Sequence, residues 1–286
     1  MAKQKLSRKK TASSAKIATY VILILGAMIS LIPFVWMIST SLKSLGEALG
    51  SSFFPSELHF ENYVEAWERA RFSEYFINSI ITAVITLTGQ VTFSIFAAYA
   101  FARIKFPGRD FIFGVLLSTM MIPAMVNIIP NFLTVTWLGR IGPVKWINNW
   151  PALTVPFMGS VFAIFLLRQF FAQIPDELFD SAQIDGAGHF RFLWQIAVPL
   201  SKAPVMVIVV LSFIGTWNSL AWPMLVTNTP DWRPISVGLM NFVQEAGQQI
   251  NLTMAGAFIT IIPIMIIYFF TQKQFTESIA RSGLKG

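Results

Sequence analysis

The residues of this 286-residue chain that could contact a solute are uncharged and lie inside apolar runs. Gln90 and Asn127 each offer an amide, and Trp217 stands directly before Asn218. An indole beside an amide suits a sugar, because a sugar presents an apolar ring face together with many hydroxyl groups. The same four residues also suit packing between membrane helices, where polar side chains hydrogen-bond across the interface. They are therefore candidates for the lining of a translocation path, and helix packing stays open as the alternative.

Groups for acid–base, metal or nucleotide chemistry are missing from the apolar runs. His59 and His189 lie in polar segments, and no Asp, Glu, Lys or Arg lies well inside a run. Intramembrane ionisable groups usually mark proton relays, so their absence argues against a proton-coupled carrier, although sodium sites built from carbonyls remain possible. The chain has no Cys, no metal-ligand spacing and no phosphate-binding P-loop. We predict no catalytic residue, no metal site and no cofactor bound by this chain.

The composition is that of a membrane protein. Hydrophobic residues make up 55% of the chain and charged residues 12%, whereas soluble domains carry about 25% charged residues. The net charge of +7 could indicate nucleic acid. The basic residues, however, sit in short loops beside apolar runs, which fits membrane topology better. We therefore expect membrane lipid around the chain and no nucleic-acid partner.

Six apolar runs reach the roughly 20 residues that cross a bilayer. They predict an all-α, polytopic membrane fold with spans at 17–40, 78–102, 111–133, 150–167, 202–227 and 252–272. The first run is too long for the core of a cleaved signal and is expected to be a retained span. Prolines are expected to break several spans. They are Pro33, Pro123, Pro130, Pro156, Pro223 and Pro263. In the third span, Pro123, Asn127 and Pro130 would share one face of a continuous helix.

The basic residues predict the orientation of these spans. If the N-terminus lies inside, inner segments hold fifteen of the 21 Lys and Arg residues, in agreement with the positive-inside rule. This gives a cytoplasmic basic N-terminus at 1–16, a membrane domain at 17–272 and a cytoplasmic tail at 273–286. The polar loop 168–201 then also faces the cytoplasm.

A polar island at 175–204 separates the fourth and fifth runs. Pro175 and Asp176 suit a helix start. Gly186 and Gly188 predict a turn, and Pro199 is expected to end a second short helix. A helix–glycine–helix module in a loop is typical of a docking element, and the alternative is an amphipathic helix lying on the bilayer.

This island resembles the cytoplasmic coupling segment, or EAA loop, of binding-protein-dependent ABC importer permeases. Asp180, Ser181 and Ala182 stand where that family has Glu-Ala-Ala. Gly186 matches the glycine, and Ile196 to Pro199 match the ending. The stretch through Asp185, Gly186 and Ala187 is similar to the carbohydrate-uptake branch of the family, of the maltose-permease type. Further similarity lies in 78–80, 102–108, 217–218 and 283–286.

The resemblance implies a permease subunit in the prokaryotic plasma (inner) membrane. Its partners would be a second related permease, two cytoplasmic ATPase subunits that hold ATP and Mg, and an extracytoplasmic solute-binding protein. The chain would form part of a path for a sugar or oligosaccharide and would not itself be an enzyme. The alternatives are a polar non-sugar solute such as a glycerol phosphate ester, and an ion-coupled secondary carrier that works alone.

The resemblance also implies two sets of ATPase-contacting residues. The coupling-loop set is Asp180, Ser181, Ala182, Asp185, Gly186, Ala187, Ile196 and Pro199. The tail set is Ser282, Gly283, Leu284, Lys285 and Gly286.

Overall fold

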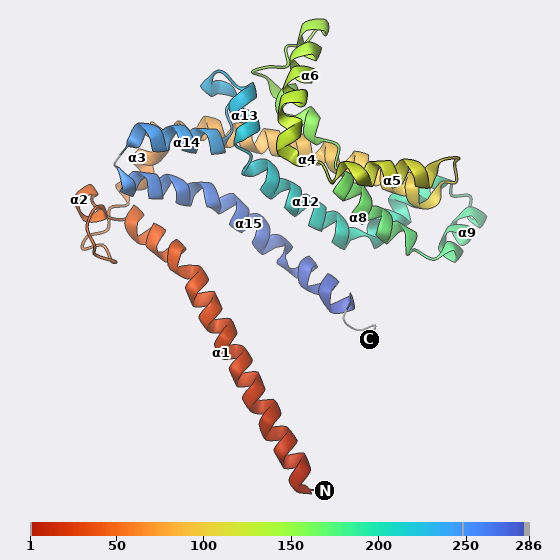
Figure 1. Ribbon diagram of the computed structural model, residues 1–286, viewed down its shortest axis with the longest axis horizontal. Helices are drawn as coiled ribbons and strands as arrows, with labels where there is room; N and C mark the ends of the chain where they lie inside the picture. Colours follow the sequence, from red (N-terminus) through yellow and green to blue (C-terminus); the bar gives the residue numbers. More distant parts are fainter. Residues whose placement is uncertain (1, 248, 283–286) are drawn as a thin grey trace. The chain divides into compact units, whose positions relative to one another are not determined.

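The computed structural model describes residues 2–247 and 249–282, and all the regular secondary structure in them is helical (Figure 1). This confirms the all-α membrane fold. Within the described residues, three helices are long and apolar enough to cross a membrane alone, and three bent helix pairs qualify together. The three continuous helices correspond to the first, second and sixth expected spans, and two of the bent pairs correspond to the third and fourth. The third bent pair, His189–Leu200 with Lys202–Trp217, begins in the polar island and covers only part of the expected span 202–227.

The chain forms two compact units. The first contains the residues up to Arg69 together with Phe242–Ile259, and the second contains Ala70–Asn241 together with the residues from Thr260 on. The helices of the first unit are α1 (Ala2–Ser41), α2 (Leu45–Ala48) and α3 (Glu61–Arg69). Those of the second are α4 (Phe72–Arg103), α5 (Arg109–Thr119), η1 (Ala124–Asn127), α6 (Ile128–Ile141), α7 (Trp150–Thr154), η2 (Val155–Phe157), α8 (Val161–Ala172), α9 (Asp176–Ile184), α10 (His189–Phe192), η3 (Leu193–Ala197), α11 (Val198–Leu200), α12 (Lys202–Trp217), α13 (Ala221–Val226) and η4 (Pro230–Trp232). Two helices, α14 (Ile235–Ala246) and α15 (Ile250–Ser282), contribute residues to both units.

In the first unit, one buried asparagine joins three segments of the chain. The Nδ2 of Asn62 in α3 donates to the carbonyls of Ser41 (2.8 Å) and Lys43 (2.9 Å) at the end of α1. The Nδ2 of Asn251 in α15 donates to the Oδ1 of Asn62 at 3.1 Å. Carbonyls at a helix end have no partner within the helix, so Asn62 both satisfies the end of α1 and ties it to α15.

The second unit is built around α4. In Figure 1, α8 and α12 run beside this helix, and α6 projects away from it. Buried apolar side chains fill the contact between α4, α8, the polar island and α12: Ile95, Ala98, Tyr99, Ala163, Leu167, Phe171, Phe192, Leu193 and Ile208. At about 1.5 Å per residue, a 32-residue helix is longer than the roughly 30 Å hydrocarbon core. Helix α4 thus extends beyond the hydrocarbon core, and it begins at Phe72, six residues before the expected start of the span.

The third span is not the continuous helix that we expected. Helix α5 ends at Thr119, and the segment from Ala124 to Ile141 leaves at 95° to it. Pro123 lies in the break. Proline interrupts a helix because it has no N–H for the helical hydrogen bonds and disfavours a helical conformation in the residue before it. Pro123, Asn127 and Pro130 therefore do not share one helix face: they lie before η1, at its end and in α6.

The other prolines differ in whether the helix is broken near them. The fourth span bends by 42° between η2 and α8, and it extends to Ala172, beyond the expected end at 167. The fifth breaks between Trp217 and Ala221. Pro33 and Pro263, expected to break spans, lie inside the continuous helices α1 and α15. Proline in an apolar run thus marks a break in some spans and is absorbed in others.

We predict that Gly238→Ala destabilises the second unit. A Cβ at Gly238 would lie 2.0 Å from Cδ2 of the buried Tyr75 ring, and overpacking of this kind costs about 1–3 kcal/mol. Gly215→Ala in α12 is the control, because its Cβ would meet no heavy atom within 4 Å. Thermal unfolding in detergent measures both variants. Equal stabilities would show that Tyr75 has room to move.

Candidate functional site

A partly open cavity of about 330 Å³ lies in the second unit. This volume is at the lower end of the range for small-molecule sites. The residues that line it are all uncharged: Thr82, Gln90, Leu153, Phe157, Gly159, Ser160, Ser212, Gly215, Thr216, Ser219, Trp222, Pro223 and Pro234. Hydroxyl groups and one amide provide the polar atoms, and Phe157 and Trp222 provide aromatic surface. Such a wall can hydrogen-bond a neutral polar solute and stack against an apolar face.

The cavity forms where two spans are broken. Gly159 and Ser160 lie between η2 and α8, and Ser219 lies between α12 and α13. The Oγ of Ser160 caps α8 by accepting from the N–H of Ala163 at 3.2 Å. The Oγ of Ser236 donates to the Ser219 carbonyl at 2.5 Å. Non-helical backbone at membrane depth is tolerated where it lines a cavity. Both breaks border this cavity, and that position is consistent with the rule.

Trp222 is the cavity aromatic whose position is fixed by a hydrogen bond. Its Nε1 donates to the carbonyl of Ala152 at 2.8 Å, which ties α13 to α7. Its ring meets Phe157 edge to face, with centroids 5.7 Å apart. The indole N–H is therefore already used, and what the ring offers to a solute is apolar surface.

A row of polar residues runs along α4. Asn78, Thr82, Thr86, Gln90 and Ser94 follow one another at intervals of four, so successive residues lie one turn apart on the same side and the row winds slowly around α4. Asn78 donates to the carbonyls of Asp231 and Arg233. The hydroxyls of Thr82, Thr86 and Ser94 are buried without a hydrogen-bond partner. Buried polar groups are normally paired, and of these three only Thr82 lines the cavity. Thr82 is therefore the residue of these three that brings a buried, unpaired hydroxyl to the cavity wall.

The four predicted lining residues end up in different places. Gln90 lines the cavity, whereas Trp217 is 2% exposed and donates its indole N–H to the carbonyl of Thr260 at 3.0 Å. Asn218 is exposed at the end of α12, and Asn127 is exposed at the end of η1. Neither asparagine lines this cavity. The prediction missed Thr82, which the four-residue spacing along α4 could have revealed.

The polar island has the expected helix–glycine–helix form. Helix α9 ends at Ile184, Gly186 takes a φ of 77°, and α10 begins at His189. Two hydrogen bonds close the turn: the Gly186 N–H donates to the Gln183 carbonyl (2.9 Å), and the Ala187 N–H donates to the Ala182 carbonyl (2.8 Å). Bonds of this kind satisfy the carbonyls at a helix end when a glycine there adopts a left-handed conformation.

We expected Pro199 to end the second short helix, and the structure shows that it does not. The helix begins at His189 and continues to Leu200, with a π-helical turn, η3, just before Pro199. In this turn the N–H of Val198 bonds to the carbonyl of Leu193, five residues back. A π turn widens the helix locally, and here it stands next to the proline that lacks an N–H. The chain turns by 78° only after Leu200.

The module exposes some of its predicted contact residues and buries others. Asp180, Ser181, Asp185, Gly186 and Pro199 are exposed, and Ala187 and Ile196 are half-buried. Ala182 is 6% exposed and belongs to the core of the second unit. Of the tail set, Ser282 is the last residue of α15, and Gly283, Leu284, Lys285 and Gly286 lie outside the described residues. Among the described side chains, no group of three His, Asp or Glu residues could hold a metal ion.

The fold and the neutral cavity define a multi-pass membrane transport protein. Residues 90–279 match the family described as binding-protein-dependent transport system inner membrane component, and the chain belongs to this family. It is thus a permease of the inner membrane.

Similar proteins cover almost the whole chain. The diacetylchitobiose uptake system permease protein of Streptomyces coelicolor is 28% identical over 98% of this chain and 93% of its own length. The sn-glycerol-3-phosphate transport system permease protein of Brucella abortus is 33% identical over 92% and 95%. A solved bacterial ABC transporter involved in the import of the acidic polysaccharide alginate superposes with a TM-score of 0.78, at 25% identity over 90% and 95%.

We predict that Gly186→Ala loosens the module and Gly188→Ala does not. An alanine at a φ of 77° costs about 1–2 kcal/mol, whereas Gly188 has a φ of −80°, and both positions have open space for a Cβ. Hydrogen exchange in residues 176–192 should be about 5- to 30-fold faster in Gly186→Ala than in Gly188→Ala. Equal exchange would mean that the turn adapts to a side chain.

Proposed function

We propose that this permease is a subunit of an ATP-driven importer and forms part of the path of a neutral sugar or oligosaccharide. The observation that carries the proposal is the cavity wall, which combines free and paired hydroxyls with the rings of Phe157 and Trp222 and carries no charge. A sugar can use each part of this wall, because its hydroxyls hydrogen-bond and its ring face stacks on aromatic surface. The name of the diacetylchitobiose relative agrees with this choice.

The second candidate is a polar non-sugar solute such as a glycerol phosphate ester, which the name of the Brucella relative suggests. A phosphate is anionic, and moving a charge into a cavity without a counter-charge costs several kcal/mol. Lys and Arg are the usual partners of phosphate, and neither lines this cavity. We therefore rank the sugar first. An ion-coupled carrier working alone ranks last, because the family is binding-protein-dependent.

In the proposed importer, energy enters through partner subunits. The exposed residues of the polar island, among them Asp180, Ile184 and Phe190, suit docking of a helix into a groove on an ATPase subunit. The tail at 282–286 would make a second contact. ATP and Mg belong to the ATPases, a second related permease completes the path, and an extracytoplasmic binding protein delivers the solute. Both chain ends and the loop 168–201 then face the cytoplasm.

The cavity role predicts a difference between two threonines on α4. Thr82→Val removes the unpaired hydroxyl in the cavity and should raise the uptake KM about three- to tenfold, the effect of losing one hydrogen bond. Thr86→Val is the control, because its hydroxyl is equally unpaired and buried but does not line the cavity. Uptake of labelled oligosaccharides and of labelled glycerol phosphate by whole cells gives the KM of wild type and of both variants. Equal KM values for all three proteins, or saturable uptake of glycerol phosphate alone, would contradict the sugar path.

The proposed orientation predicts which positions are accessible from outside the cell. The chain has no natural Cys, so a single introduced cysteine reports one site. Ile184 is 87% exposed in the polar island, and Phe54 is 72% exposed in the segment after α2. A membrane-impermeant thiol reagent should label Phe54→Cys in intact cells and Ile184→Cys only after permeabilisation. The opposite pattern would reverse the topology.

A further inference from the structure

A tyrosine hydroxyl fastens the polar island to α4. Tyr99 is 3% exposed, and its Oη lies 2.9 Å from Nδ1 of His189, the first residue of α10. The His189 ring stacks on Phe179 of α9, with centroids 4.9 Å apart and planes 26° apart. One contact from α4 therefore reaches both helices of the island.

Neighbouring rings hold this contact in place. Phe192 meets Phe179 edge to face, with centroids 5.0 Å apart, and is itself fully buried. Phe171 of α8 meets the Tyr99 ring edge to face at 6.2 Å. Since aromatic pairs of this geometry stabilise one another beyond their buried area, the Tyr99 ring is fixed, and its hydroxyl has a defined partner.

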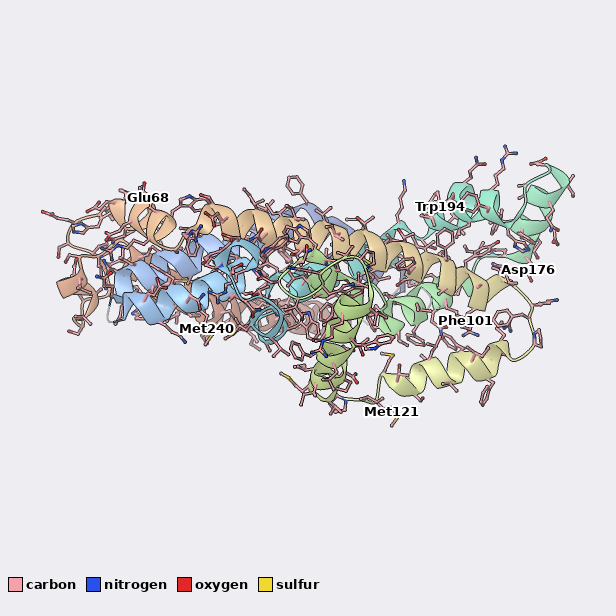
Figure 2. All side chains as sticks on the ribbon, turned by 90° about the horizontal axis from the view of Figure 1, so that it is seen from above. Glu68, Phe101, Met121, Asp176, Trp194 and Met240 are labelled. Carbon is pink, nitrogen blue, oxygen red and sulfur yellow. The ribbon has the colours of Figure 1, made fainter. Side chains whose placement is uncertain are left out.

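A second attachment lies one turn further along α4. The Arg103 side chain is 8% exposed, and its Nε donates to the carbonyl of Phe171 at 3.0 Å. Its two other nitrogens donate to the carbonyl of Ile174 and pair with the carboxylate of Asp176. The planar guanidinium thus spans the end of α8 and the start of α9. Figure 2 shows Phe101 of α4 and Asp176 of α9 near the same end of the second unit.

The same helix reaches the cavity without a break. Gln90 precedes Tyr99 by nine residues in α4, which is about 13 Å at the helical rise, and Thr82 lies a further 12 Å or so away. Elsewhere around the cavity the chain is interrupted, between η2 and α8 and between α12 and α13. Helix α4 therefore connects the island to the cavity without interruption, and a displacement of the island can be passed along it.

We propose that Tyr99 and Arg103 are positioning residues that transmit movement of the polar island to the cavity through α4. This rests on the proposed function, in which the island docks on the ATPases. Arg103 holds the start of α9, and the Tyr99–His189 hydrogen bond holds the start of α10. Loss of the Tyr99 hydroxyl loosens the attachment of α10 to α4, while the Arg103 contacts remain, so part of the ATP is hydrolysed without matching uptake.

The test compares Tyr99→Phe with wild type in the complete importer, reconstituted with its ATPases and binding protein. Tyr99→Phe should lower the maximal uptake rate about three- to tenfold, the effect of one lost hydrogen bond. The KM for solute should stay within about twofold, and ATP consumed per solute should rise by the same factor as uptake falls. Tyr63→Phe is the matched control, because it removes a tyrosine hydroxyl that bonds Ser41 in the first unit (2.6 Å). Its ATP-to-solute ratio should equal that of wild type.

Variants of His189 separate the hydrogen bond from packing. His189→Asn keeps a polar atom near the position of Nδ1 and should retain most of the coupling. His189→Phe keeps a ring on Phe179 and should behave like Tyr99→Phe. The double variant Tyr99→Phe/His189→Phe should be no worse than either single variant, since both remove the same bond. Additive losses, or wild-type coupling in both single variants, would overturn the proposal.

A measurement without transport distinguishes this proposal from the proposed function. In the purified complex, Tyr99→Phe should speed hydrogen exchange both in residues 189–197 and in residues 82–92 of α4, whereas Tyr63→Phe should change neither. Faster exchange confined to 189–197 would overturn transmission through α4. Failure of the wild-type complex to couple ATP hydrolysis to uptake would overturn the proposed function, and the exchange data would still decide the role of Tyr99.

Discussion

The second unit is shaped by the need of every backbone N–H and C=O at membrane depth for a partner. A helix satisfies its backbone groups internally. A break in a helix is therefore tolerated only where side chains, other backbone groups or a solvent-filled space supply the missing hydrogen bonds. Ser160 caps the start of α8, and Asn148 accepts from two backbone N–H groups after α13. The breaks at 158–160 and 218–220 then border one neutral cavity. The cavity is thus a consequence of where the helical ladder is interrupted.

Against these interrupted spans, α4 stands out as continuous. Its polar row begins with Asn78, whose side-chain amide donates to two backbone carbonyls, and continues to Thr82, whose hydroxyl has no partner. Its far end meets the polar island through Tyr99 and Arg103. One helix therefore combines a structural anchor, a cavity wall and an attachment for the proposed docking module. A membrane helix can combine these roles because its faces and its two ends are used separately.

Sequence patterns predicted the class of fold and the helix–glycine–helix island, since hydropathy and glycine position report local requirements. They did not predict the 95° bend after α5, because a proline shows where a helix is weakened and packing decides the new direction. They also favoured Trp217 over Trp222. Both tryptophans lie in one apolar run, and only the break after Asn218 turns Trp222 toward the cavity and leaves Trp217 in the packing. The Tyr99–His189 contact joins residues 90 positions apart, which no local pattern reports.

The uncharged wall of the cavity has an energetic consequence for the proposed importer. Moving one elementary charge across a membrane involves about 2.3 kcal/mol per 100 mV. A neutral solute passing a neutral wall does no such electrical work, so the voltage across the inner membrane neither drives nor opposes its passage here. The steepness of the solute gradient that the cell can sustain would then be set by ATP alone, whatever the state of the proton or sodium gradients.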